Sequence, residues 1–249
     1  MTSYSSLARF YDSLTGDVPY AAMADFYEQL FRERGLAVRS IVDLACGTGT
    51  LTSLLAGRGY DMIGVDASED MLAQAAEKAE GLSGRLLFLN QPMECLDLYG
   101  TVDAAVCSLD GMNYVKPSLL KDVFHRVRLF LEPGGLFVFD IHTPARLKSL
   151  DGEVYLDETP DVFCVWRTFF DSRENACYYG MDIFERVGSK WLRSREEHVE
   201  YAYDPRDLES LLVNEGFTDV RLYGDLKHTP PDESDTRIFI AATKGTGNG

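Results

Sequence analysis

Between residues 40 and 142, short apolar runs alternate with longer stretches in which apolar residues recur every three to four positions. The runs lack strict polar–apolar alternation, which is typical of strands buried on both faces of a sheet. The longer stretches are typical of amphipathic helices, and the alternation of the two predicts a parallel sheet covered by helices. The expected strands are 40–45, 61–65, 86–89, 102–107 and 136–141, and the expected helices are 50–57, 68–79 and 117–130.

A helical cap is expected before the sheet. Apolar residues recur at helical spacing over residues 4–34, with a break near Gly16, and Gly35 is typical of a helix end. We therefore expect residues 1–35 to form a cap of two helical pieces that precedes the core.

After residue 142 the pattern changes. Within an expected insertion of residues 149–203, residues 153–203 are rich in aromatic and charged side chains, and tight breaks separate their apolar runs at 162–170, 176–187 and 190–203. Such runs predict an antiparallel meander inserted into the parallel fold. A helix near 204–214 and strands near 217–223 and 236–243 then complete the core, which we expect to comprise residues 36–148 and 204–244. The predicted class is α/β, with a doubly wound, mostly parallel, seven-stranded sheet.

The stretch from Ile41 to Thr50 carries the clearest chemical signal. A buried strand ends in a turn that contains Gly47 and Gly49 and opens a helix, so bare backbone N–H groups and a helix N-terminus lie beside any ligand there. Asp66 ends the next apolar run, where its carboxylate can accept both hydroxyls of a ribose. Together these residues predict a nucleoside-containing cofactor at the carboxyl ends of parallel strands.

The glycine pattern bears on which cofactor is bound. The Gly-x-Gly-x-x-Gly pattern that lets a pyrophosphate pass is incomplete, because Thr52 stands at the third glycine position. Asp43 adds a carboxylate before the loop, which would repel a pyrophosphate and suits a cationic ammonium group. A nicotinamide-dependent oxidoreductase is therefore the less favoured alternative.

Residues Asp43 to Gly49 resemble the first motif of class I S-adenosylmethionine-dependent methyltransferases. Further segments resemble the family in the same order: Tyr11–Leu14, Gly64–Leu72, Asn90–Met93, Asp103–Tyr114 and Leu131–Gly135. The resemblance covers roughly residues 4–243. It implies a Rossmann-like fold, S-adenosyl-L-methionine as the cofactor, and the small-molecule branch in which a β-meander forms a lid.

The resemblance also implies roles for individual residues. Those expected to contact the cofactor are Tyr11, Asp43, Ala45, Cys46, Gly47, Gly49, Asp66, Ala67, Met71, Met93 and Leu109. Those expected near the transferred methyl group or the acceptor are Tyr11, Asp110 and His142, with His142 either a general base or a structural histidine. Pro92 departs from the family, which often has an aspartate there to bind the adenine amino group.

Composition limits the partners. With 40 acidic and 24 basic residues the net charge is −16, which disfavours nucleic acid and anionic membranes and favours a neutral or cationic small molecule, although an acid excess also serves solubility. The five cysteines form no Cys-x-x-Cys pair, so we expect no metal site and reduced thiols in a cytoplasmic protein. No signal peptide and no membrane span are evident. A monomer and a homodimer both stay open.

The expected activity is methyl transfer from S-adenosylmethionine to a nitrogen or an oxygen atom of a small molecule. The principal alternative is a binding module that keeps the cofactor site without transferring the methyl group. The sequence does not name the acceptor, because pockets for amines and for hydroxyls make similar demands.

Overall fold

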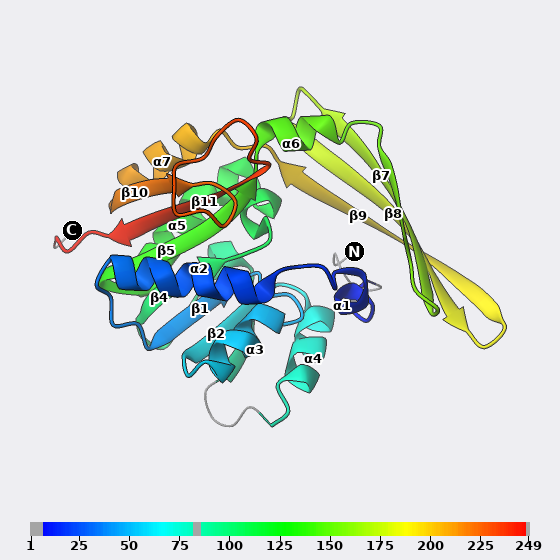
Figure 1. Ribbon diagram of the computed structural model, residues 1–249, viewed down its shortest axis with the longest axis horizontal. Helices are drawn as coiled ribbons and strands as arrows, with labels where there is room; N and C mark the ends of the chain where they lie inside the picture. Colours follow the sequence, from blue (N-terminus) through cyan, green and yellow to red (C-terminus); the bar gives the residue numbers. More distant parts are fainter. Residues whose placement is uncertain (1–6, 82–85, 248–249) are drawn as a thin grey trace.

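The computed structural model describes residues 7–81 and 86–247. Its core is a seven-stranded sheet in the order β10-β11-β5-β4-β1-β2-β3, in which β11 runs antiparallel to both neighbours and the other pairs are parallel (Figure 1). The predicted doubly wound, mostly parallel, Rossmann-like sheet is confirmed. The strands are β1 (Ser40–Leu44), β2 (Asp61–Asp66), β3 (Leu86–Asn90), β4 (Val102–Cys107), β5 (Leu131–His142), β10 (Phe217–Tyr223) and β11 (Arg237–Lys244).

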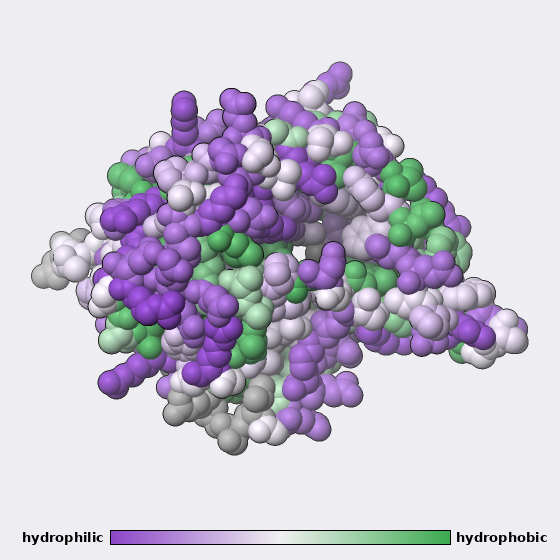
Figure 2. Space-filling view, in the orientation of Figure 1, coloured by the Kyte–Doolittle hydropathy of each residue, from purple (hydrophilic) through white to green (hydrophobic). Residues whose placement is uncertain are grey.

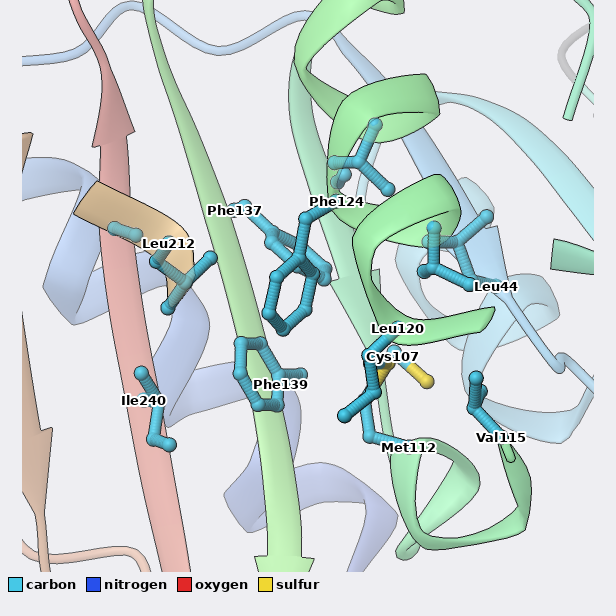
Figure 3. Close-up of a cluster of buried hydrophobic side chains, with 14 of the residues drawn as sticks. Leu44, Cys107, Met112, Val115, Leu120, Phe124, Phe137, Phe139, Leu212 and Ile240 are labelled. Atoms are coloured by element: carbon cyan, nitrogen blue, oxygen red, sulfur yellow. The ribbon is translucent and has the colours of Figure 1, made fainter. Parts of the chain in front are cut away.

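Helices cover both faces of this sheet. On one face, α2 (Tyr20–Glu33) and α3 (Thr50–Gly57) pack on side chains such as Leu136 and Val138. On the other face, α5 (Leu120–Phe130) and α7 (Pro205–Asn214) pack on Phe137 and Phe139, as Figure 3 shows. Successive residues of β5 thus serve opposite cores, which explains why Leu136 to Phe139 are all apolar. The helix α4 (Glu69–Lys78) lies beside α3 and against β3.

The insertion forms a second, antiparallel sheet in the order β6-β7-β8-β9, which stands beside the core (Figure 1) and which we call the lid. Its strands are β6 (Val154–Glu158), β7 (Val162–Asp171), β8 (Ala176–Val187) and β9 (Lys190–Tyr201), and α6 (Pro144–Ser149) precedes them. Three of these strands match the predicted runs. The fourth, β6, was not predicted, because it is a mostly exposed edge strand and buries no apolar face.

The cap has the two predicted helical pieces, but the first is shorter than expected. Within its described part, the first helical piece is only α1 (Tyr11–Leu14), and residues 7–10 form turns, while residues 4–6 lie outside the described residues. The lid explains this difference. The backbone N–H of Leu7 donates to Glu196 Oε1 at 3.0 Å, and the Leu7 side chain packs against Val162 and Cys164. Contacts with the lid thus override the helical pattern.

Pro133, Gly134 and Gly135 are residues typical of turns, yet the segment Glu132–Gly135 lies inside β5. Leu131 pairs with Val102, the register then shifts, and Gly134 has a φ of 82°, so the segment is a bulge that lets the strand continue.

Two further observations concern the cysteines and the helices. All five cysteines are free thiols. Among the residues that the structure describes, every helix is too short or too polar to span a membrane.

Candidate active site

A cavity of about 610 Å³ opens at the carboxyl ends of β1, β2 and β4. Its floor comes from the glycine loop after β1 and from the segments that follow β2, β3 and β4. Tyr11 and Tyr20 of the cap and Glu197 to Val199 of lid strand β9 complete its walls. In Figure 2 the surface is hollowed between the core and the lid. This is the switch point of a doubly wound sheet, where ligands bind.

The two loop glycines serve different purposes. Both have left-handed backbone angles, with φ of 54° at Gly47 and 67° at Gly49. A Cβ atom at Gly47 would meet no heavy atom of the described residues within 4 Å, so Gly47 presents bare backbone to the cavity. A Cβ atom at Gly49 would lie 2.9 Å from Ala75 Cβ and 3.0 Å from Phe88 Cζ. Gly49 therefore lies behind the cavity wall, where it lets α3 approach α4 and β3.

Two carboxylates flank this loop. Asp66 Oδ2 accepts the backbone N–H of Gly47 at 2.8 Å, and Asp66 Oδ1 accepts that of Ser68 at 2.8 Å. Burial raises the pKa of Asp66. Asp43 is buried beneath the loop and accepts the Thr52 hydroxyl at 2.6 Å, and burial raises its pKa to about 7. The loop is thus held in place before a ligand is bound.

Ten of the eleven residues expected to contact the cofactor line the cavity, and the eleventh is Gly49. The ten are Tyr11, Asp43, Ala45, Cys46, Gly47, Asp66, Ala67, Met71, Met93 and Leu109. Gln91, Pro92 and Glu94 line the same region as Met93.

The cap is fastened to the glycine loop. The carboxylate of Asp12 accepts the Thr48 hydroxyl at 2.6 Å and the Thr50 hydroxyl at 3.2 Å, and it pairs with Lys78 of α4 at 2.6 Å. These contacts bring Tyr11, the neighbour of Asp12, into the cavity wall. Burial raises the pKa of Tyr11, so its hydroxyl stays protonated at neutral pH.

The segment after β4 has an unusual backbone. Leu109 and Asp110 both have a φ of 55°, although neither is a glycine. Their backbone N–H groups donate to the two carboxylate oxygens of Asp140, at 2.8 and 2.9 Å. Asp140 belongs to β5 and is fully buried. The buried carboxylate thus fixes a segment in which Leu109 borders the cavity.

Arg237 connects this segment to His142. Its guanidinium donates to Asp140, to Asp110 Oδ1 at 2.8 Å, and to His142 Nε2 at 3.0 Å. The other ring nitrogen, Nδ1, lies 3.0 Å from Glu200 Oε2 of lid strand β9. Burial lowers the pKa of His142, but Asp110 and Glu200 outweigh it and leave the pKa above its ordinary value.

Of the three residues expected to act on the acceptor, only Tyr11 is among the described residues that line the cavity. Asp110 and His142 lie behind the wall that Leu109 and Gly111 form. Sequence reasoning missed their partners Asp140, Glu200 and Arg237. A usable signal existed for Asp140, which is the one acid within the apolar run 136–141.

Asp110, His142 and Glu200 also bring potential metal-ligating atoms within 4.8 Å of one another. The Arg237 guanidinium donates to two of these three side chains, and its charge disfavours a metal ion in the same space. The arrangement is therefore better described as a hydrogen-bonded charge network than as a metal centre.

The Asn113 side chain bridges the two ends of the insertion. Asn113 is fully buried, its Oδ1 accepts the backbone N–H of His142 at 3.0 Å, and its Nδ2 donates to the Tyr201 carbonyl at 2.9 Å. The chain leaves the core after His142 and returns to it after Tyr201. Asn113 therefore sets the distance between the two points where the lid is attached.

Comparison with known proteins agrees with this site. A family model described as a methyltransferase domain matches residues 41–135. The chain is 32% identical to the Bacillus subtilis (strain 168) protein named "Putative methyltransferase YqeM" over 244 residues, which cover 97% of each protein.

Solved structures show the same fold. An S-adenosylmethionine-dependent methyltransferase from Clostridium acetobutylicum has 28% identity and a TM-score of 0.87, and the match covers 97% of this chain and 99% of that one. The sugar N-methyltransferase KedS8 from Streptoalloteichus has 19% identity and a TM-score of 0.80, covering 98% of this chain and 94% of the other. The glycine loop, Asp66 and these similarities lead to one conclusion: the chain belongs to the class I S-adenosylmethionine-dependent methyltransferases.

Proposed function

We propose that this enzyme transfers the methyl group to a nitrogen or an oxygen atom of a small-molecule acceptor. The observation that carries the proposal is the shared cavity, in which the expected cofactor residues line one part and lid residues Glu197, His198 and Val199 line another. Its volume of about 610 Å³ lies in the range of small-molecule sites, about 300–1,000 Å³. The net charge of −16 supports a neutral or cationic acceptor over a nucleic acid.

The cavity fits S-adenosylmethionine. The bare backbone at Gly47 leaves room for the cofactor, and we expect Asp66 to accept the ribose hydroxyls with the lone pairs that Gly47 and Ser68 do not use. We expect Asp43 to face the ammonium group, since a nearby cation lowers the pKa of a carboxyl and favours its charged form.

The adenine contact departs from the family at Pro92. Proline offers neither a side-chain acceptor nor an N–H group. We expect the backbone N–H of Met93 to bind adenine N1, and Glu94 or water to meet the amino group. Met71 is expected to pack on the adenine face.

When bound, S-adenosylmethionine supplies a methyl group on a positively charged sulfur, which is a good leaving group. The residues of the chain then have to orient the acceptor and exclude water. Tyr11 is suited to both tasks, because it covers the cavity from the cap and its ring attracts a cation. Leu109, in the segment after β4, borders the same cavity from the core.

An acceptor that carries a proton needs a base, and His142 is our candidate. Its Nδ1 is held by Glu200, so Nε2 is the atom that would take the proton. That step requires Arg237 to release Nε2 and the wall at Leu109 and Gly111 to admit the acceptor to His142. Asp110 Oδ1, which lies 3.8 Å from Nε2, would then stabilise the charged ring. The similarity to a sugar N-methyltransferase supports an amine as the acceptor.

The test follows the methyl group. Purified enzyme and radiolabelled S-adenosylmethionine are incubated with a panel of small amines and hydroxyl compounds and, separately, with RNA and with cell protein. We expect label in small molecules and S-adenosylhomocysteine as the co-product. The variant Asp66→Ala, which removes both loop contacts of Asp66, is the inactive control. Label that enters only RNA or protein would overturn the proposal.

A further inference from the structure

We propose that Asp140 and Arg237 are positioning residues for methyl transfer, which hold Leu109 and Asp110 in the left-handed conformation that shapes the cavity wall. Neither residue is among the described residues that line the cavity, and neither belongs to a motif discussed above. The proposal rests on the methyltransferase activity and is independent of the acceptor class.

The backbone of this segment requires an external support. Two successive non-glycine residues with a φ of 55° are uncommon and strained. In this conformation neighbouring N–H groups converge and form a concave site for an anion. The Asp140 carboxylate occupies that site, with one oxygen on each N–H at 2.8 and 2.9 Å. The strained backbone and the buried acid therefore depend on each other.

Arg237 stabilises the buried acid. A fully buried carboxylate is costly without a cationic partner, and Arg237 provides one from the neighbouring strand β11. The planar guanidinium also binds Asp110 Oδ1 at 2.8 Å, so Arg237 holds the side chain of the residue whose backbone N–H donates to Asp140. A lysine could supply the charge, but its single nitrogen could not reproduce the two guanidinium nitrogens that donate to Asp140 and to Asp110.

The same guanidinium extends the network to the lid. It donates to His142 Nε2 at 3.0 Å, and His142 Nδ1 lies 3.0 Å from Glu200 Oε2 on β9. The wall segment of the core and the lid strand thus share one chain of hydrogen bonds. The position of the wall relative to an acceptor under the lid depends on that chain.

Loss of Asp140 or Arg237 should affect the rate of methyl transfer more than the affinity for the cofactor. Leu109 and Gly111 line the cavity on the β4 side, whereas Gly47 and Asp66 line it on the β1 and β2 side. Relaxation of the β4 side should therefore misplace the reacting groups while most of the cofactor site stays intact. Displacements of about 1 Å can cost about 100-fold in rate.

The first test compares two carboxylates that each accept two backbone N–H groups, one near the amino ends of the strands and one near their carboxyl ends. Asp140→Asn is the test variant. Asp103→Asn is its matched control, because Asp103 Oδ2 accepts the backbone N–H groups of Arg39 and Ser40, at 2.8 and 2.9 Å, far from the carboxyl ends of the strands. The one oxygen of asparagine can accept both N–H groups at position 103, where both bind Oδ2, but only one of the two at position 140. Only Asp140→Asn should therefore lose catalysis.

Two measurements separate the variants. Deuterium exchange in residues 107–112 should accelerate at least about tenfold in Asp140→Asn and stay unchanged in Asp103→Asn, because only the former replaces one of the two oxygens that accept these amides with an NH2 group. With the acceptor that reacts fastest in the panel above, kcat of Asp140→Asn should fall about 10- to 100-fold, while its affinity for S-adenosylhomocysteine changes less than about threefold. Unchanged exchange would overturn the proposal whether or not the panel yields an acceptor.

Arg237 provides the second test. Arg237→Met should reproduce the loss of kcat, and Arg237→Lys should restore part of it, because the charge near Asp140 returns without the fork. Arg221→Met is the control, since Arg221 is an exposed arginine on β10 that pairs with Asp219. Full activity in Arg237→Met, or equal losses in Arg237→Met and Arg221→Met, would refute the positioning role.

Discussion

The two loop glycines allow the demands of folding and of cofactor binding to be measured separately. At Gly49, alanine would adopt a left-handed φ at a cost of about 1–2 kcal/mol. Its Cβ atom would also lie 2.9 Å from Ala75 Cβ and 3.0 Å from Phe88 Cζ, an overpacking that typically costs about 1–3 kcal/mol. We therefore expect Gly49→Ala to lower the free energy of unfolding by about 2–5 kcal/mol.

At Gly47 the backbone cost is the same, but the new methyl group would enter the cavity and meet no other atom of the described chain within 4 Å. Gly47→Ala should thus lose only about 1–2 kcal/mol of stability. Its affinity for S-adenosylhomocysteine should fall at least about tenfold, which corresponds to about 1.4 kcal/mol. The two alanine variants should therefore differ by about 1–3 kcal/mol in stability.

Urea unfolding of the ligand-free protein gives the stabilities, and calorimetry with S-adenosylhomocysteine gives the affinity. Gly57→Ala is the control, because Gly57 closes α3 without a positive φ and its Cβ atom would meet no described atom within 4 Å. It should be neutral or stabilising by up to about 1 kcal/mol. Equal stability losses in Gly47→Ala and Gly49→Ala would refute the packing role assigned to Gly49.

Three further predictions concern charged residues. Because burial raises the pKa of Asp43 from 3.8 to about 7, the folded chain binds this proton more tightly than the unfolded chain, and stability falls as the pH rises from about 4 to 7. Between pH 5 and pH 7 the free energy of unfolding should fall by about 2–3 kcal/mol less in Asp43→Asn than in the unchanged protein. Plots of the free energy of unfolding against pH that run parallel for the two proteins would contradict this. Asp12→Ala breaks the contacts with Thr48 and Lys78 and should speed limited proteolysis of the cap, and unchanged cleavage would show that Asp12 does not hold it. His142→Gln should lower turnover about 100-fold or more and leave cofactor affinity unchanged, and unaltered turnover would reject the base role.

Local patterns were enough to predict the residues that line the β1 and β2 side of the cavity. The β1 strand, its loop and α3 are contiguous, and their periodicity and glycines are visible within ten residues. Asp66 follows one strand later, and adjacent parallel strands bring their carboxyl ends together. The pairing of β1 with β2 is enough to bring Gly47 and Asp66 within hydrogen-bonding distance.

The β4 side of the cavity and the fold of the cap depend on contacts between distant parts of the chain, which sequence patterns do not reveal. Arg237 lies 127 positions from Asp110 and 97 from Asp140, and an arginine at the start of a strand has the pattern of a solvated residue. The turn at Leu7 depends on Glu196, which is 189 positions away. Periodicity describes which face is buried, but it does not identify the partner of a charged side chain.

The link between Asn113 and the two ends of the insertion has a consequence for how such enzymes diverge. Because this buried amide holds the last residue of β5 beside the last residue of β9, the ends of any replacement segment would be required to span one fixed gap. A differently shaped segment grafted between them would change the lid residues that line the cavity and would leave the residues after β1 and β2 unchanged. New acceptors are therefore accessible through exchange of one contiguous module rather than through many scattered substitutions.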